Sequence, residues 1–527
     1  MQKRLLNKTA RVLVSVMILS LLFPVLGYAA GIKWYDNQNG TVTVEVYLDE
    51  TEFQDLFPDP TVEKAVYVDV YYNNAWHSNV MRATYDSLRS DSYYYFTFNY
   101  FTTATQDTYS PVMFRYGGAV TDWVYKQNSQ GPIIWFPGNG TTVKDGTIEL
   151  SFGNEVTAAD LQKAFESTSD VVVKIPGDFV YLPASALASA PAGATVTVVN
   201  EKGSYTLPVF ALDYEALADE LGVSVADLKI KVTIELANPG TAEDIAEAVA
   251  EIGGTQVAAA VNFSVVAEGN GKTVAIDNFG DVYASRMIPL KSDIDPDQTT
   301  GVLYDPETGE FRFIPTVFKD GVATLKSTTN SIYTVISSDV SGSDIVGHWG
   351  APEIEKLANK LVVQGVGANR FSPDRAVNRA EFTAMLVRSL ALPIVSTDSG
   401  FSDVDANAWY AGVIATAAEY GLVNGYSDGT FRPQKTITRE EIAAMVVRAA
   451  AFAGENISVT SSEQQRLLGG YQDAGKIKWG HQEIAAAIKA GIVQGTSATT
   501  LRPDANATRA QAAAMILRYL EYVGFID

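Results

Sequence analysis

The feature that most constrains the fold of this chain is a motif that occurs three times in its C-terminal third. Each copy is marked by a tryptophan: Trp349, Trp409 and Trp479. From each tryptophan, a proline follows after 24 residues, an arginine after 30, a methionine after 36 and a second arginine after 39. Spacing this regular indicates three copies of one supersecondary unit.

The local structure of each copy can be predicted, most clearly in the second one. After Trp409, the stretch AGVIATAAEYG has alanine and apolar residues at helical spacing, which predicts a helix. The loop YSDGTFRP follows, with Gly429 and Pro433 as turn residues. A second helix then begins, because Thr438 is a good N-cap and Glu441 completes a capping box.

Capping does not explain the arginine at the first position of each second helix. A cation there faces the positive end of the helix dipole, which is unfavourable by roughly a few tenths of a kcal/mol. Conflicts of this kind collect at functional sites, so we favour a functional explanation, in which the arginine and free helix-end N–H groups hold an anion. The structural alternative is that each arginine pairs with a carboxylate of a neighbouring copy. The aspartate before each tryptophan could orient the arginine or accept sugar hydroxyls, and the tryptophan could stack on a sugar or fill the core.

The second copy, FSDVDANAWYAGVIATAAEYGLVNGYSDGTFRPQKTITREEIAAMVVR, resembles an S-layer homology (SLH) domain. Three such domains stand in tandem, at residues 341–396, 397–460 and 468–527. The resemblance implies an all-α, pseudo-threefold unit around a central helix bundle, with grooves that bind an anionic secondary cell-wall polymer, a pyruvylated polysaccharide. It implies that the groove residues are Asp344, Trp349, Arg379, Asp403, Trp409, Arg439, Asp473, Trp479 and Arg509.

The resemblance also implies non-covalent attachment to the wall of a Gram-positive-type bacterium, through several modest sites that gain affinity from their linkage. The three copies depart from the family's pattern by different amounts. The first has Asn378 for the usual threonine, whereas the third has Gln511 for glutamate and TSATT for the loop YSDGT. The second groove therefore follows the pattern best and the third least.

Residues 1–30 have the features of a secretory signal peptide: four basic residues, the apolar run VLVSVMILSLLFPVL and small residues around GYAA. The apolar run is short for a bilayer span, so we expect cleavage rather than an uncleaved anchor. We predict a secreted protein with no membrane insertion after signal cleavage, located at the cell wall.

Residues 31–137 alternate apolar and polar positions with period two between Asn, Gly and Asp turns, which predicts a small β-sandwich. Its aromatic residues Trp76, Tyr95 and Trp123 are candidates for a glycan-binding platform. The segment has a weak similarity to starch-binding β-sandwich modules, although Asp122 precedes its tryptophan instead of following it. An exogenous polysaccharide is then a second partner; a plain Ig-like spacer is the alternative.

Residues 141–340 mix strands such as VVVKIP, ATVTVVN and KIKVTIEL with short helices such as TAADLQKAFES and YEALADELG. This mixture predicts a β-rich α+β middle region of one or two domains. We find no nucleophile elbow, zinc-ligand cluster or phosphate loop in the sequence, and the region is short for a glycosidase barrel of about 250 residues. We therefore expect no catalytic residues and no enzyme activity.

Composition excludes further classes of function. The chain has no cysteine and three scattered histidines, so we predict no thiol chemistry, no metal site and no cofactor. Residues 341–527 hold 17 basic and 19 acidic residues, so most of the net charge of −22 lies before them. Such acidity argues against nucleic acid as a partner. The sequence thus predicts a wall-anchored surface protein; the alternatives are a wall-anchored polysaccharide-degrading enzyme and a surface-layer lattice protein.

Overall fold

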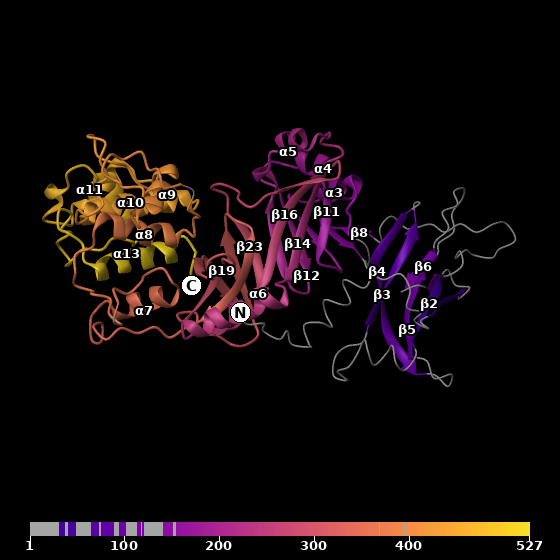
Figure 1. Cartoon of the computed structure of the whole chain (residues 1–527). Coiled ribbons are helices and arrows are strands. Elements are labelled where there is room, and N and C mark those ends of the chain that lie inside the picture. The colour runs from indigo at the N-terminus through magenta and orange to yellow at the C-terminus, as the bar shows by residue number, and fades with distance from the viewer. Residues whose placement is uncertain are drawn as a thin grey trace. The chain divides into compact units, whose positions relative to one another are not determined.

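The computed structural model places the chain in two compact units, one formed by Met1–Thr142 with Leu150–Gly153 and the other by Val143–Glu149 with Asn154–Asp527 (Figure 1). The structure describes residues 31–36, 41–48, 65–72, 75–88, 94–101, 113–116, 119–120, 141–150, 154–367, 369–394 and 396–527. The predicted signal peptide, residues 1–30, and Trp123 lie outside the described residues. Within the described part, no helix has both the length and the apolar character needed to cross a membrane.

The first unit contains one antiparallel sheet, with its strands in the order β1-β2-β5-β4-β3-β6-β7. Its strands are β1 (Gly31–Asp36), β2 (Thr41–Leu48), β3 (Ala65–Tyr72), β4 (Ala75–Leu88), β5 (Tyr94–Phe101), β6 (Met113–Tyr116) and β7 (Ala119–Val120). Trp76 lies in β4 and Tyr95 in β5, and these two strands are neighbours in the sheet. The sandwich expected for residues 31–137 stays a prediction.

The middle region of the chain is built from two sheets. The first runs β21 (Thr316–Lys319), β22 (Val322–Ser327), β18 (Ala284–Pro289), β13 (Gly203–Pro208), β12 (Thr195–Asn200), β10 (Asp170–Lys174), β9 (Thr147–Leu150) and β8 (Thr141–Lys144). The second runs β11 (Phe179–Pro183), β14 (Lys229–Leu236), β16 (Val261–Gly269), β23 (Ser331–Ser337), β19 (Thr299–Tyr304) and β20 (Phe311–Ile314), with β15 (Thr255–Gln256) beside β23 and β17 (Lys272–Ala275) beside β16.

The two sheets pack through side chains that alternate between buried and less buried positions, as in β16. Tyr205 of the first sheet stacks on Phe263 of the second, with ring centroids 6.0 Å apart. The fully buried guanidinium of Arg286 lies 4.9 Å from the Tyr205 ring and 4.8 Å from the ring of Tyr333. Helices α3 (Ala158–Phe165), α4 (Ala184–Ala188) and α5 (Tyr214–Leu221) gather at one end of the sheets, and α6 (Pro239–Glu251) lies at the other (Figure 1).

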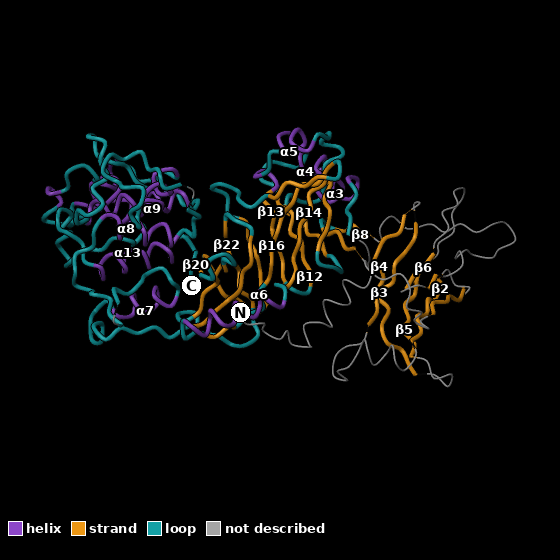
Figure 2. The backbone as a smooth tube through the Cα atoms, in the orientation of Figure 1, coloured by secondary structure: helices purple, strands orange, loops and turns teal. Residues whose placement is uncertain are grey.

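Helices dominate the C-terminal part, as Figure 2 shows. Repeat 1 carries α7 (Ala351–Asn359) and α8 (Arg379–Ser389), and repeat 2 carries α9 (Ala411–Glu419) and α10 (Arg439–Phe452). The short helix α11 (Ser461–Leu468) precedes repeat 3, which carries α12 (His481–Lys489) and α13 (Arg509–Tyr522). The second helices α8, α10 and α13 contact one another pairwise, and a continuous apolar core joins all three repeats.

A ring of backbone hydrogen bonds ties the three repeats together just before these second helices. The N–H of Val377 donates to the carbonyl of Ala507 at 3.0 Å, the N–H of Ala507 to Ile437 at 3.0 Å, and the N–H of Ile437 to Val377 at 3.1 Å. Each repeat therefore donates to one neighbour and accepts from the other. The ring gives the three repeats their pseudo-threefold arrangement.

The repeats also bond to the middle region. The N–H of Thr316 in β21 donates to the carbonyl of Phe525 at 2.7 Å, close to the C-terminus. The ammonium of Lys360, which follows α7 and is 1% exposed, donates to the carbonyls of Pro296 at 2.7 Å and Thr299 at 2.8 Å. The Tyr283 hydroxyl donates to the carbonyl of Leu390 at 2.7 Å. These bonds connect the middle region to both ends of the repeat assembly.

Candidate functional site

The repeated arginines lie at three equivalent junctions, where the first turn of a second helix meets the loop of the next repeat. At junction 1–2, Arg379 donates through Nε to the carbonyl of Phe431 at 2.9 Å. At junction 2–3, Arg439 donates to the carbonyl of Leu501 at 2.9 Å. At junction 3–1, Arg509 closes the ring by donating to the carbonyl of Phe371 at 2.7 Å. A second contact with the same loop comes from the terminal nitrogen Nη2, which donates to the carbonyls of Asn424, Gln494 and Gln364 respectively.

The predicted aspartates hold the same loops from the other side. Both carboxylate oxygens of Asp403 accept backbone N–H groups, from Phe431 at 2.7 Å and Arg432 at 2.7 Å. Asp344 and Asp473 bond to the corresponding loop residues of repeats 1 and 3 in the same way. A single loop residue therefore bonds to both side chains. The N–H of Phe431 donates to Asp403 of its own repeat, and the carbonyl of Phe431 accepts from Arg379 of the preceding repeat. The structure thus brings each arginine together with the aspartate of the following repeat, not of its own.

These aspartates stabilise a turn that contains one residue in the left-handed backbone conformation, which is unfavourable for residues other than glycine. The residue after the doubly held one has a positive φ in every repeat, at 51° for Ser372, 62° for Arg432 and 51° for Arg502. Such left-handed backbone persists only where surrounding bonds fix it. Burial by itself would raise the pKa of Asp344, but the N–H groups of Phe371 and Ser372 outweigh it and lower that pKa below its usual value.

The three tryptophans lie on the surface rather than in the core. Trp349, Trp409 and Trp479 are 56%, 59% and 52% exposed. Of the two roles considered for them, this exposure leaves stacking on a ligand and removes filling of the core. The Trp479 backbone N–H lies 2.8 Å from an oxygen of Glu440, next to Arg439, so this tryptophan belongs to junction 2–3. By the same geometry, Gly350 beside Trp349 packs on Ala510, next to Arg509.

The expectation that free helix-end N–H groups flank each arginine is wrong. At the start of α10, the N–H of Arg439 donates to the carbonyl of Ala505, and the N–H of Glu440 donates to Pro503. The third N–H, of Glu441, is capped by Thr438. The helices α8 and α13 use their first N–H groups in the same way. The loop of the next repeat therefore occupies the place where an anion was expected.

The arginine side chains are buried, at 5% to 7% exposure, and part of their role is structural. At junction 1–2, Arg379 also pairs with Glu441 of repeat 2 at 3.2 Å, which is the neighbouring-carboxylate pairing that the sequence left open. Burial, with Arg518 nearby, lowers the pKa of Arg439 to about 10. Burial also lowers the pKa of Arg509. At junctions 2–3 and 3–1, a buried cation at the start of a second helix thus lies close in the chain to a residue that packs at or beside an exposed tryptophan.

Sequence reasoning missed Tyr426 and Lys435, which make junction 1–2 different from the others. The Tyr426 hydroxyl donates to Glu441 at 2.7 Å, and the Lys435 ammonium donates to that hydroxyl at 2.9 Å. The Arg432 guanidinium lies 4.1 Å from the Tyr426 ring centroid. The signal was present in the second copy, whose loop YSDGT begins with an aromatic residue where the other copies have valine and threonine.

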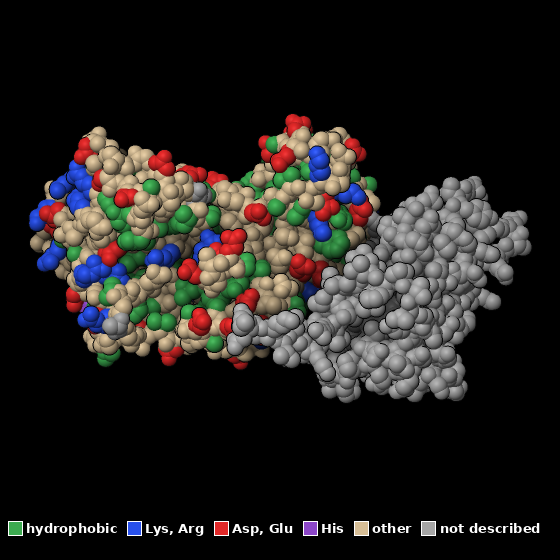
Figure 3. Space-filling view, viewed as in Figure 1, with side chains coloured by type: hydrophobic (Ala, Val, Ile, Leu, Met, Phe, Trp, Pro, Cys, Tyr) green, Lys and Arg blue, Asp and Glu red, His purple; other side chains and the backbone are tan. Residues whose placement is uncertain are grey.

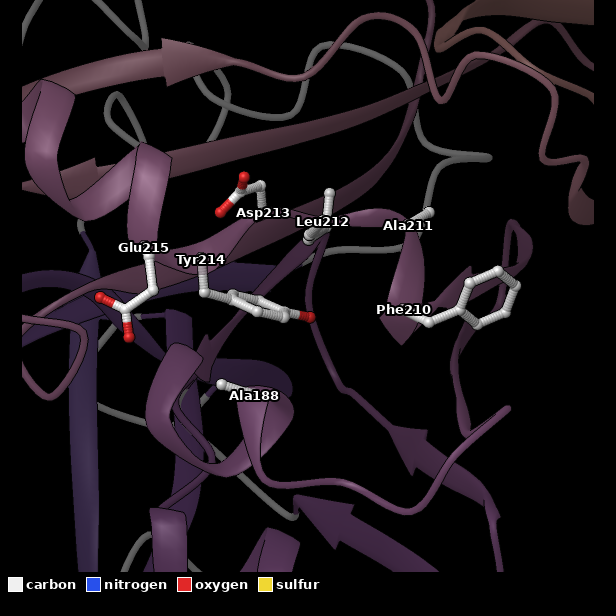
Figure 4. A pocket seen from close by; sticks show the side chains of 7 residues that line it. All are labelled: Ala188, Phe210, Ala211, Leu212, Asp213, Tyr214 and Glu215. Atoms are coloured by element: carbon white, nitrogen blue, oxygen red, sulfur yellow. The ribbon is translucent and has the colours of Figure 1, made fainter.

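Away from the junctions, the middle region has a shallow pocket of about 510 Å³ (Figure 4). Its lining includes Phe210, which is 61% exposed, with Asp213 and Tyr214. The Asp213 carboxylate caps α5 by accepting the N–H of Ala216 at 3.0 Å, and the Tyr214 hydroxyl donates to the carbonyl of Val209 at 2.8 Å. These two polar groups therefore hold the local fold.

On the face drawn in Figure 3, lysine and arginine side chains gather mainly over the repeats. This distribution agrees with the near-neutral charge of residues 341–527 and the acidity of the preceding part. A wall polymer that carries negative charge would meet less repulsion at the repeats than at the middle region.

Comparison with known proteins supports these repeats as a recognised domain. Residues 343–383, 400–443 and 470–513 match the S-layer homology domain. The chain is 34% identical over 239 residues to Amylopullulanase of Thermoanaerobacterium thermosulfurigenes, which covers 44% of this chain and 12% of that protein. It is 30% identical to Surface-layer 125 kDa protein of Lysinibacillus sphaericus, over 34% of this chain and 14% of that one. It is 29% identical to Cellulosome-anchoring protein of Acetivibrio thermocellus, over 30% of this chain and 35% of that one.

The chain spans only 12% to 18% of the length of the first three relatives, so the match concerns a part that proteins of different activity share. S-layer homology domains indicate anchoring at the bacterial cell wall, and the junctions of this chain bring its predicted arginines and aspartates to the same loops. The C-terminal part of the chain, from residue 343 to residue 513, therefore consists of three S-layer homology domains.

Proposed function

We propose that the three repeats hold this protein non-covalently to an anionic secondary cell-wall polymer, a pyruvylated polysaccharide, which binds at the junctions. The observation that carries this proposal is that, at junctions 2–3 and 3–1, the segment with an exposed tryptophan packs on the start of the second helix that carries a buried arginine of the neighbouring repeat. An aromatic face suits the apolar face of a sugar ring, and a nearby cation favours a sugar that bears a carboxylate. Several such sites on one chain gain affinity from their linkage.

The parts of the chain that precede the repeats would be the region that the anchor displays at the cell surface. We propose that residues 1–30 direct secretion from a Gram-positive-type cell and that residues 31–137 and 141–340 form domains displayed outward. In this proposal residues 31–137 are a β-sandwich that binds an exogenous polysaccharide, and the displayed region is not catalytic. The names of the relatives keep one alternative open, a wall-anchored polysaccharide-degrading enzyme, which release of reducing sugar from a panel of glucans and xylans would reveal.

The anchor is tested with the chain from residue 31 onward, because the repeats bond to the middle region and are best kept with it. The protein is mixed with purified cell-wall sacculi, either intact or chemically stripped of their secondary polymer, and the bound fraction is measured. We expect binding to intact sacculi only. Equal binding to stripped sacculi would contradict the proposal.

A variant with Trp349, Trp409 and Trp479 all changed to alanine should lose binding. The matched control is Tyr522→Ala, which removes an exposed aromatic at the end of α13 far from its junction. If the control loses as much binding as the tryptophan variant, the junctions are not the binding sites.

A further inference from the structure

The three second helices also differ at one position that, at junctions 2–3 and 3–1, packs on the tryptophan segment of the next repeat. The second residue of the second helix is Ala380 in α8 and Ala510 in α13, but it is Glu440 in α10. Only junction 2–3 therefore carries an ionisable side chain at this position. In sequence, the difference is TRE in the second copy against NRA and TRA in the others.

Glu440 points into its junction rather than into solvent. The residue is 2% exposed, and its oxygen Oε1 accepts three consecutive backbone N–H groups, from Lys478 at 3.0 Å, Trp479 at 2.8 Å and Gly480 at 2.7 Å. These groups stand at the start of α12, where the helix dipole favours a negative charge. Gly480 allows this approach, because a Cβ atom there would lie 3.2 Å from Cγ of Glu440.

The three N–H groups include that of Trp479, the exposed aromatic of this junction. A carboxylate carried by a sugar that is stacked on the Trp479 ring would need donors close to that ring, and Glu440 already occupies them. A tethered carboxylate competes at a high effective concentration, so a ligand carboxylate has to displace it at a cost. Junction 2–3 is in this sense already filled by the protein's own anion.

The other two junctions have a methyl group at this place. At junction 3–1, Ala510 packs on Gly350, with its Cβ 3.1 Å from the position that a Cβ of Gly350 would take. This is the same pairing as Glu440 with Gly480, without the carboxylate. The N–H of Gly350 donates here to the neutral acceptor Nδ1 of His348 at 3.0 Å, and the N–H of His348 donates to the carbonyl of Ile345 at 2.9 Å, so these two donors hold no carboxylate of the protein. At junction 1–2, the second helix again carries an alanine, Ala380, and the residue that follows the tryptophan of repeat 2 is Tyr410 instead of a glycine.

We propose that Glu440 closes junction 2–3 to carboxylate-bearing ligands, so that the anchor binds its polymer through junctions 1–2 and 3–1 only. This inference rests on the proposed function, because it concerns which of its three sites accept ligand. It also identifies the inactive site: Trp479 of the third repeat would bind no ligand, and the cause would be Glu440 of the second repeat.

The test is the number of binding sites per chain, measured by isothermal titration calorimetry on the chain from residue 31 onward. The probe is a methyl hexopyranoside that carries one pyruvate ketal, so each site takes one carboxylate. We expect two sites in the unchanged protein and three in Glu440→Ala. The matched control Glu455→Ala, which removes an exposed glutamate of the same repeat, should keep two sites.

The reciprocal variant keeps the test decisive if Glu440→Ala does not fold. Ala510→Glu should place a carboxylate opposite Gly350 and reduce the number of sites from two to one. Three sites in the unchanged protein, or two in a folded Glu440→Ala variant, would overturn the inference while leaving the anchor intact. If the probe binds to no variant but the chain still binds intact sacculi, wall anchoring stands, whereas both the pyruvylated ligand and this inference are refuted; if neither binds, the whole proposed function fails.

Discussion

Arg439→Ala separates the structural role of the repeated arginines from the binding role that we propose for them. The side chain is 6% exposed and donates to the carbonyls of Leu501 at 2.9 Å and Gln494 at 2.6 Å. Alanine leaves both acceptors without this donor, at about 1–3 kcal/mol each. The Gln494 oxygen is only partly buried, so water replaces part of that loss, and removing the guanidinium relieves its unfavourable burial. We expect the free energy of unfolding to fall by about 3 kcal/mol.

The measurement is urea unfolding of the chain from residue 31 onward, followed by far-UV circular dichroism. Arg466→Ala is the matched control, because Arg466 is exposed on α11, and its effect should stay below about 0.5 kcal/mol. Arg439→Lys should lie between the two, since an ammonium cannot reproduce the planar fork that reaches two carbonyls. If Arg439→Ala unfolds like the control but loses wall binding, the arginine is a ligand-binding residue only and the structural argument fails.

Three further predictions concern other parts of the repeats. Burial, with Lys356 nearby, lowers the pKa of Lys360 to about 8, so between pH 8 and pH 10.5 the unfolded chain binds one proton more than the folded chain. The free energy of unfolding, compared with that of Lys360→Met, should therefore rise by about 3 kcal/mol as the pH increases across this range. Urea unfolding measured at several pH values checks this. Trp409→Ala should weaken binding to sacculi about fivefold or more with little change in melting temperature, because the ring is 59% exposed; a large drop in melting temperature would contradict this. Phe525→Ala should lower the free energy of unfolding by about 3–5 kcal/mol, because the ring is 1% exposed; thermal unfolding without a shift would exclude that burial.

The local structure of the repeats could be predicted from sequence because it depends on near neighbours. The capping box of Thr438 with Glu441 is present, and Asn378 with Glu381 forms the same box in repeat 1. The expected helices TAADLQKAFES and YEALADELG appear as α3 and α5 for the same reason, since period and caps are written in consecutive residues.

The partners of the arginines could not be predicted, because spacing within a copy does not say which copy a side chain reaches. Arg379 contacts a residue 52 positions away, and Arg509 contacts one 138 positions away. The sequence left two possibilities open, orientation by the aspartate of the same copy or pairing with a carboxylate of a neighbouring copy, and the structure holds each arginine against the loop of the next repeat. The order of the strands in the middle region could not be predicted for the same reason. In the sheet β18 lies between β13 and β22, although these two strands are far apart in the chain. Pairing of this kind depends on tertiary packing, which no local pattern records.

The bond between Arg509 and Phe371 has a consequence for how many repeats such a unit can contain. In an open stack of repeats, one unit can be added or lost at an end, and the others keep their neighbours. Here every repeat is both donor and acceptor in a closed circuit, so removing one leaves two faces without partners and inserting one requires a different angle at every junction. The closed circuit therefore favours a fixed number of three repeats, whereas a single junction can differ from the others without breaking the circuit, as junction 2–3 does at Glu440.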